Sequence, residues 1–433
     1  MKKLLAVLLA LVMLFGLAAC GEKTPPAADT PSAPEEPAVP ATPAQPEDPA
    51  QPEEPAVVLS PEEQILADRR AAVVSYMRAL SSMLWEVDET LVYTLTSNVT
   101  PEQASSGKIL TLKAGQIYQG VPYGYAAGSE ACWLEMLSEP NADGVRKVQG
   151  VTWQALSGTG TYARLGADCS SAVERSWQSI GANIPAKSTN AMTPDNGFLR
   201  VGEYESPNDT FEDTVKVAIA NGKDKMFAAY ALLQPGDAVV CRTSTGHAMM
   251  VVGVDIVLRD DGTINGLKST VTVVEQTGGS RTIRNEATGK LVNTFFRIDQ
   301  PYTFNDLLKE GYLPITCKEL IDPAPMEEAK VTDSNTAPSA ANLFVGVLQS
   351  THGMDAVTVT VSAGGSEVQK CIARPVRANV YSFNMDQFLS DGPEKLSGSV
   401  DLTKLSAGSY RCTVTARTVS GQTFTVREFD FTV

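Results

Sequence analysis

The segment around Cys169 contains the residue types of a nucleophilic site. Cys169 follows a glycine-rich stretch and precedes a run, residues 172–180, in which Val173, Trp177 and Ile180 share one helical face. A cysteine in the first turn of a helix lies beside free backbone N–H groups and the positive end of the helix dipole, which favour its thiolate. The same N–H groups can stabilise an oxyanion. A buried structural thiol is the alternative, because free cysteines are among the most buried residues.

His247 is the candidate base for that thiol. The chain has only two histidines, and His352 falls in a turn-like stretch, residues 350–355, where we expect it to be solvated. His247 instead stands at the start of residues 246–254, which are apolar at nearly every position. Such a run predicts a strand covered on both faces, with the histidine held rigidly at its end. A hydrogen-bonded histidine at the edge of the core is the alternative.

A third candidate group ends the β-branched run of residues 269–276. Glu275 and Gln276 stand there, just before Gly278-Gly279, where we expect a turn. Neighbouring strand residues point to opposite faces, so only one of the two can orient His247 as the third member of a triad does. A carboxylate stabilises an imidazolium, so Glu275 is the predicted orienting residue and Gln276 the alternative. An ordinary polar pair in solvent is the other interpretation.

In their order along the chain, these pieces resemble the NlpC-type and CHAP-type cell-wall cysteine peptidases and amidases. The resemblance spans roughly residues 115–280 and includes Asp168-Cys169-Ser170, Pro235-Gly236-Asp237 followed by Gly246-His247, Val274-Glu275-Gln276, and upstream Gly120-Val121-Pro122-Tyr123. It implies a papain-like fold, in which the cysteine helix packs on an antiparallel sheet that carries the histidine. It makes Cys169 the nucleophile, His247 the base and Glu275 the orienting residue.

The resemblance also implies substrate contacts from Tyr123, Asp168 and Ser170, and it implies no cofactor. The chain departs from the family pattern where Ser170 or Ser171 replaces the usual Gly of NlpC-type proteins, and where Thr277 replaces the frequent Asn of CHAP-type proteins. A metal site is not expected, because histidine is nearly absent and no Cys-x-x-Cys pair occurs.

The first residues predict export. Two lysines precede an apolar stretch, residues 4–17, that is too short for an ordinary membrane span, and Leu17-Ala18-Ala19-Cys20 resembles a bacterial lipoprotein signal. This implies a signal peptide over residues 1–19 and lipid on Cys20, which would make the protein an extracellular lipoprotein of the cell membrane. A plain secretory signal is the alternative. Residues 20–58, rich in Pro, Glu and Ala, predict a disordered tether.

The rest of the chain divides by composition. At 433 residues with 43% hydrophobic residues, it has room for two or three domains. We expect an α+β catalytic domain over residues 59–321, a linker over 322–340, and an all-β, immunoglobulin-like sandwich over 341–433. Ser60-Pro61 should start a helix whose apolar stripe packs on the catalytic domain. The stripe residues are Leu66, Val73, Met77, Leu80 and Leu84.

Two features of the last domain are singled out by sequence. Residues 407–412 look like the tyrosine-corner segment of immunoglobulin-like domains, with Tyr410 as the tyrosine. Cys371 and Cys412 could form a disulfide within that domain. Its ligand is not evident, and neither is the oligomeric state.

The charge of the chain restricts its partners. A net charge of -15 and a pI of about 4.7 argue against the binding of nucleic acid. We therefore predict a membrane-anchored cysteine hydrolase that cleaves amide bonds of peptidoglycan or its stem peptides. The aspartate beside the nucleophile slightly favours a substrate with a free amine. A catalytically inactive surface-binding lipoprotein and a transglutaminase-like acyl transferase are the alternatives.

Overall fold

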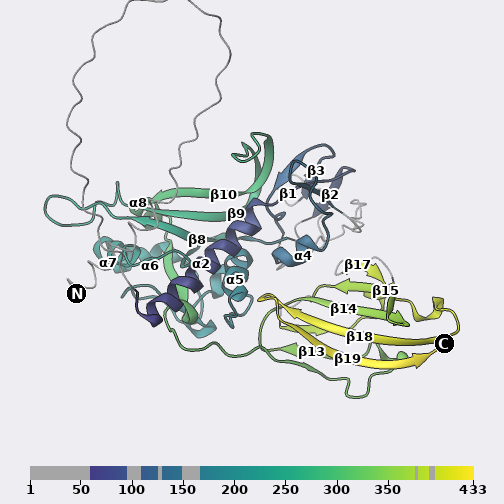
Figure 1. Ribbon diagram of the computed structural model, residues 1–433. Helices are drawn as coiled ribbons and strands as arrows, with labels where there is room; N and C mark the ends of the chain where they lie inside the picture. Colours follow the sequence, from purple (N-terminus) through teal and green to yellow (C-terminus); the bar gives the residue numbers. More distant parts are fainter. Residues whose placement is uncertain (1–58, 95–108, 125–128, 149–165, 376–378, 390–394) are drawn as a thin grey trace, which may run out of the picture. The chain divides into compact units, whose positions relative to one another are not determined.

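The computed structural model describes residues 59–94, 109–124, 129–148, 166–375, 379–389 and 395–433. The predicted signal peptide, the predicted lipid-attachment residue Cys20 and the predicted tether lie outside the described residues. Helices and sheets both occur, which gives a mixed α/β protein, as predicted at that level (Figure 1). None of the helices found in the described ranges combines the length and apolar character that crossing a bilayer requires.

The α-helices, and the strands up to β11, have the following bounds. The helices are α2 (Pro61–Ser82), α4 (Glu130–Leu134), α5 (Cys169–Ser179), α6 (Thr214–Asn221), α7 (Lys223–Tyr230), α8 (Phe304–Lys309) and α9 (Met385–Leu389). A nine-stranded sheet contains β1 (Leu84–Glu86), β4 (Ile117–Gln119), β5 (Val145–Lys147), β6 (Phe198–Arg200), β7 (Ala238–Arg242), β8 (Gly246–Asp255), β9 (Thr270–Arg284), β10 (Leu291–Thr303) and β11 (Leu313–Cys317). A separate hairpin pairs β2 (Leu91–Thr94) with β3 (Ile109–Leu112).

The nine-stranded sheet places the predicted histidine strand near its centre. Its spatial order is β5-β1-β4-β10-β9-β8-β7-β11-β6, and β7, β8, β9 and β10 pair as antiparallel neighbours. The expected turn at Gly278-Gly279 is wrong, because β9 continues through both glycines to Arg284. Gln276 pairs with Phe296 and Arg281 with Thr294, so the glycines lie in a local irregularity of the β9–β10 ladder. Cross-strand pairing here overrides the local turn signal.

Helix α5 packs against β8 and β9 and is buried along almost its whole length (Figure 1). Val173 and Trp177 are fully buried, while Ile180 caps the helix and is half-buried. The Trp177 indole Nε1 donates to the carbonyl of Gly236 at 2.7 Å. The turn that precedes β7 therefore fixes the helix relative to the sheet.

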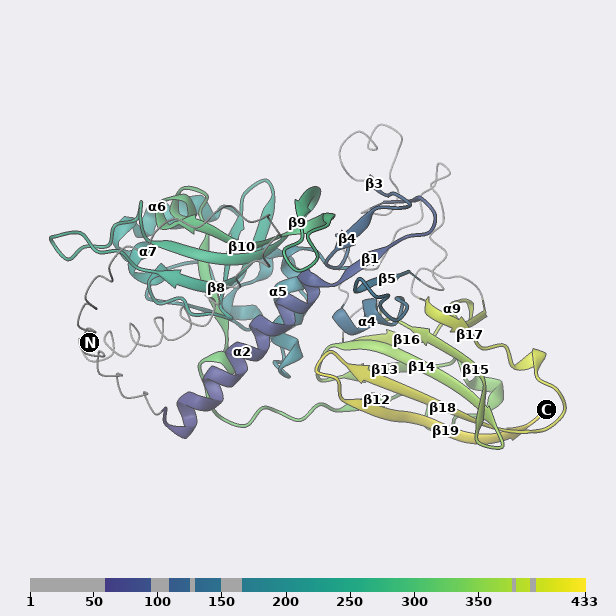
Figure 2. The ribbon, with the colours of Figure 1, turned by 45° about the horizontal axis from the view of Figure 1, so that its top comes forward.

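Helix α2 packs on the same turn, close to α5 in both views (Figures 1 and 2). Arg70 donates to the carbonyl of Pro235 at 3.1 Å and to Asp237 Oδ1 at 2.9 Å. The helix begins at Pro61 as predicted, and Val73, Met77 and Leu80 are buried in the core of this part of the chain. Leu84 differs from the prediction, since it belongs to β1.

The strands from Val331 onward form two further antiparallel sheets that share one hydrophobic core (Figure 2). The three-stranded sheet has the order β12-β13-β16, and the five-stranded sheet has the order β17-β15-β14-β18-β19. Their bounds are β12 (Val331–Asp333), β13 (Val347–Ser350), β14 (Met354–Ala363), β15 (Ser366–Ala373), β16 (Val380–Ser382), β17 (Lys395–Ser399), β18 (Ser409–Thr418) and β19 (Thr423–Thr432). Strand β12 lies inside the range predicted as a linker.

Cys371 and Cys412 are both free thiols, so the disulfide considered from sequence is not formed. Cys371 lies on β15 and Cys412 on β18, and β14 separates these strands. Two strand spacings amount to about 10 Å, whereas a disulfide needs Cα atoms within about 7 Å. Tyr410 donates its hydroxyl to the carbonyl of Ser406 at 2.8 Å, four residues upstream.

Residues Glu63–Val433 form one compact unit, and a buried polar network lies between β14 and the α4 region. Asp355 accepts hydrogen bonds from Ser129 Oγ at 2.9 Å and from Arg417 Nε at 2.8 Å. Arg417 also donates to Glu135 Oε1 at 2.9 Å. The expectation that His352 is solvated is wrong: it is 4% exposed, because the segment before β14 is packed into the interior of this unit.

Candidate functional site

Asp168 and Cys169 form the N-terminus of α5. Asp168 is the N-cap, and its Oδ1 accepts from the backbone N–H of Ser171 at 2.8 Å. The Ser171 hydroxyl accepts in return from the Asp168 N–H at 2.8 Å, which completes a capping box. Cys169 is the first helical residue and is 7% exposed. With the Ser171 N–H occupied, the N–H groups of Cys169 and Ser170 are those of the first turn without an intrahelical acceptor.

His247 lies between Cys169 and Glu275. Its Nε2 pairs with Glu275 Oε2, and the Cys169 thiol lies close enough to the imidazole to raise its pKa. Because Nε2 is bonded to the carboxylate, the nitrogen left for the thiol is Nδ1. Cysteine, histidine and glutamate thus come together from α5, β8 and β9. The catalytic roles assigned to these three residues from sequence remain predictions.

His247 and Glu275 shift each other's pKa. Burial alone would lower the pKa of His247, but the hydrogen bonds and charges of Cys169 and Glu275 raise it to about 9. Burial alone would raise the pKa of Glu275, yet its hydrogen bonds to His247 and Tyr302 and the charge of Arg297 hold that pKa below its usual value. The site therefore favours an imidazolium facing a carboxylate near neutral pH.

Glu275 and Gln276 point to opposite faces of β9, and the structure distinguishes their surroundings. The Glu275 side chain is buried against His247. The Gln276 amide Nε2 donates to the carbonyls of Val121 and Pro122, both at 3.1 Å. Glu275 is therefore the residue in contact with the histidine, and Gln276 anchors the upstream loop.

That loop, residues 120–124, links the strand of Gln276 to the start of α5. Ala167 donates its N–H to the Pro122 carbonyl at 3.1 Å, and Gly124 donates to the Ala167 carbonyl at 3.0 Å. Gly166 has a φ of +102°, and a Cβ there would lie 2.0 Å from the Pro122 oxygen. Only glycine allows the chain to approach the loop so closely just before the candidate nucleophile.

The three predicted substrate contacts have structural partners of their own. Tyr123 is 9% exposed, and its ring lies next to Gly278. The Ser170 hydroxyl donates to Asp168 Oδ1 at 3.1 Å, and the same oxygen caps the helix. The Asp168 carboxylate thus has a capping role that the sequence interpretation missed. The Asp-x-x-Ser pattern before an apolar helical run was the signal that could have found it.

Further residues around the histidine were not singled out from sequence. Tyr302 donates its hydroxyl to Glu275 Oε1 at 2.6 Å, and Arg297 Nη1 lies 3.3 Å from the same oxygen. Tyr312 packs edge-on against the His247 ring, with centroids 6.5 Å apart. It also lies beside Cys241, which is the residue paired with His247 across β7 and β8. No local sequence pattern marks these residues, because they come from β10 and from the position just before β11.

The other described thiols differ from Cys169 in their surroundings. Burial raises the pKa of Cys132 and Cys371 to about 11 and of Cys412 to about 12. Burial also raises the pKa of Cys241 and Cys317. Cys241 is half-buried. Among the described residues, no group of three or more His, Cys, Asp and Glu side chains is placed to hold a metal ion.

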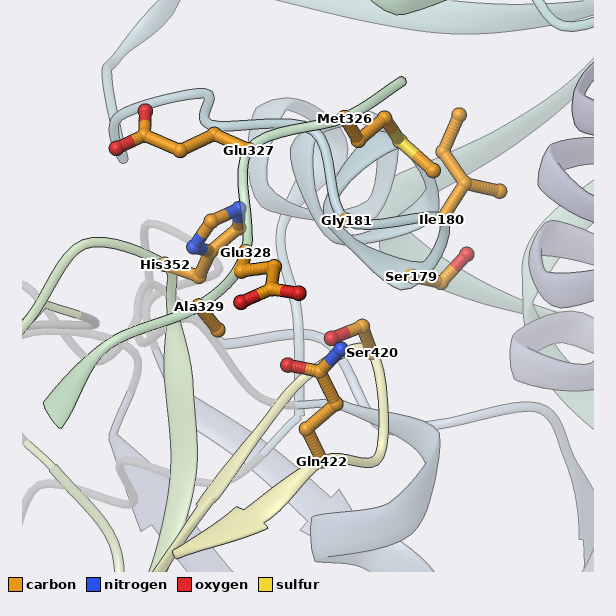
Figure 3. A pocket seen from close by; sticks show the side chains of 10 residues that line it. All are labelled: Ser179, Ile180, Gly181, Met326, Glu327, Glu328, Ala329, His352, Ser420 and Gln422. Atoms are coloured by element: carbon orange, nitrogen blue, oxygen red, sulfur yellow. The ribbon is translucent and has the colours of Figure 1, made fainter.

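A cavity of about 260 Å³ lies at the opposite end of α5 (Figure 3). It is lined by Ser179, Ile180, Gly181, Met326, Glu327, Glu328, Ala329, His352, Ser420 and Gln422. The ten residues from Cys169 to Ser179 span about 15 Å of helix. This cavity is therefore separate from the Cys169–His247–Glu275 group.

No family model matches the chain, and no curated protein matches it.

Proposed function

We propose that the protein is a cysteine hydrolase that cleaves amide bonds in peptidoglycan or its stem peptides. One observation carries the proposal: the His247 imidazole lies between the thiol that opens α5 and a buried carboxylate. A nucleophile, a base and an orienting acid in that order are the requirements for covalent acyl transfer. On this proposal the α5–β8–β9 arrangement is papain-like.

The reaction uses the two ends of the imidazole for different tasks. His247 Nδ1 takes the Cys169 proton, and the thiolate sulfur bonds to the carbonyl carbon of the substrate amide. The N–H groups at the start of α5 stabilise the oxyanion. The imidazolium then protonates the amine as the C–N bond breaks. A water molecule, deprotonated by His247, attacks the thioester and releases the acid and the thiol. Glu275 stays ionised throughout.

The place of action follows from the predicted export signal. Lipid on Cys20 would hold the enzyme on the outer face of the cell membrane, and a tether over residues 20–58 would span on the order of 100 Å if extended. Stem peptides are the nearest abundant amides there. The Asp168 carboxylate, which caps α5, gives little support to the earlier preference for a free amine. The C-terminal sheets, with the Tyr410–Ser406 hydrogen bond of a tyrosine corner, fit an immunoglobulin-like sandwich.

The proposal is tested by product analysis. The chain from residue 59 onward is incubated with purified peptidoglycan and with free stem peptides, and products are identified by mass spectrometry. Cys169→Ala and His247→Ala are the matched controls. We expect cleavage by the wild type and by neither variant. A folded wild type that cleaves neither substrate would favour a surface-binding lipoprotein. Incorporation of an added amine in place of water would identify a transglutaminase-like transferase.

A further inference from the structure

We propose that Tyr302 and Arg297 are positioning residues that keep Glu275 aligned with His247 and ionised through the whole catalytic cycle. The inference rests on the proposed function, since it concerns the same thiol–imidazole pair. Neither residue touches the substrate carbonyl in this scheme. Both act through the carboxylate.

The geometry supports two separate attachments of Glu275. One carboxylate oxygen, Oε2, is bonded to His247, and the other, Oε1, accepts from Tyr302 at 2.6 Å and lies 3.3 Å from Arg297 Nη1. Arg297 also donates to the Tyr302 hydroxyl at 3.0 Å, so the two donors form one unit on β10. With both oxygens held, the carboxylate plane cannot rotate away from the imidazole.

The register of the long hairpin produces this unit. Arg297 stands directly opposite Glu275 on β10. A shift in the ladder between Arg297 and Gln300 then brings Tyr302 back toward the same carboxylate. Regular alternation alone would not place both side chains on one oxygen five residues apart.

Arg297 and Tyr302 stabilise the Glu275 carboxylate at a stage of the reaction when His247 is neutral and cannot do so. In the free enzyme, an imidazolium can balance the Glu275 charge. In the acyl-enzyme, Cys169 is an uncharged thioester and His247 must be neutral to accept the proton of water. Glu275 is 1% exposed, so a carboxylate without a positive partner would be costly at that stage. Arg297 and Tyr302 remain beside it when the imidazolium is gone.

Charged and titratable groups surround Glu275. Burial by itself raises its pKa, and the partners around it bring that pKa below its usual value. The titratable and charged side chains that act on this carboxylate or on its partners are Cys169, His247, Arg281, Arg297, Tyr302 and Tyr312. Of these, Tyr302 and Arg297 are the two that contact Oε1.

The experiment follows the pH dependence of the alkylation of Cys169. Full-length protein in detergent is treated with iodoacetamide over a pH series, and the modification of Cys169 is quantified by peptide mass spectrometry. The variants are Tyr302→Phe, Arg297→Gln and Arg297→Lys. Tyr204→Phe is the matched control, since it also removes one tyrosine hydroxyl that donates to a buried acceptor, the Pro314 carbonyl, at 2.9 Å.

We expect the acid-side midpoint of the alkylation profile to rise by about one pH unit in Tyr302→Phe and in Arg297→Gln. Each change removes a partner of the ionised carboxylate, so Glu275 takes up a proton at higher pH and no longer stabilises the imidazolium beside Cys169. Tyr302→Phe changes no charge, so its shift cannot come from a distant loss of positive charge. Arg297→Lys should recover most of the shift, and Tyr204→Phe should show none.

Two outcomes would count against the inference, and they are distinguishable. In the first, the wild-type alkylation profile shows two titration steps while folded Tyr302→Phe and Arg297→Gln keep the wild-type midpoints. That outcome would refute the positioning roles of Tyr302 and Arg297 and leave the proposed function standing. A wild-type profile with a single midpoint near that of an ordinary thiol, about 8.5, would show that His247 does not activate Cys169, and the proposed function itself would then be refuted.

Discussion

Gly166→Ala is the substitution whose effect can be worked out most directly from the structure. The φ of +102° at this position is unfavourable for any side chain, at about 1–3 kcal/mol. The new Cβ would stand 2.0 Å from the Pro122 oxygen, and real contacts of this kind stay above 3.0 Å. The loop and the segment before Cys169 must therefore separate by about 1 Å.

That separation acts on hydrogen bonds that converge on the same oxygen. The Pro122 carbonyl accepts from the Ala167 N–H and from Gln276 Nε2, both at 3.1 Å. Losing them adds about 1 kcal/mol each. The total destabilisation should be about 3–5 kcal/mol. A shift of about 1 Å in the nucleophile should also lower the hydrolysis rate by about a hundredfold.

Gly115→Ala is the matched control. Its φ of +74° is also positive, but no atom lies within 4 Å of the position of the new Cβ. We expect a cost of about 1 kcal/mol and no loss of activity. Urea denaturation gives both stabilities, and hydrolysis of stem peptides gives both rates. Equal destabilisation of the two variants would refute the argument that the Pro122 contact fixes the position of Cys169.

Three further predictions concern single side chains. Glu275→Ala should lower turnover by about a thousandfold or more. Gln276→Ala should mainly cost stability, by about 1–3 kcal/mol, because it leaves the Val121 carbonyl unpaired and removes one of the two donors to the Pro122 carbonyl; the reverse ranking of turnover would transfer the orienting role to Gln276. Burial holds the pKa of Glu174 well above its usual value, so its contribution to stability is complete below about pH 4.3 and is lost as the pH rises through the higher folded-state pKa. Glu174→Gln should therefore be more stable than the wild type by about 1 kcal/mol at pH 8 and lose this advantage in acid, as urea titrations at several pH values would show. Metabolic labelling with a fatty acid should mark the wild type and not Cys20→Ser, and equal labelling of both would exclude lipid on that cysteine.

The parts of the candidate site that sequence could predict are those set by local periodicity. The helical face after Cys169 and the unbroken apolar run after His247 fix the types of their elements. The two-residue period of a strand separates Glu275 from Gln276. The choice between the two then followed from charge, and the structure places Glu275 beside the histidine.

The parts that sequence could not predict depend on contacts between distant segments. Gly278-Gly279 has the composition of a turn, yet β9 continues because β10 supplies a partner strand. Tyr302 lies 27 residues after Glu275, and its contact depends on a ladder irregularity that no local pattern reveals. His352 has a turn-like neighbourhood, and only tertiary packing explains its burial.

The burial of His352 has a consequence for the outer surface of the protein. His247 belongs to the candidate site and His352 is 4% exposed, so neither of the two histidines is freely exposed. The surface therefore offers its cations as lysine and arginine side chains, and the net charge of -15 means that carboxylates outnumber them. An anionic partner would have to bind through local contacts, because the long-range field of the protein repels it.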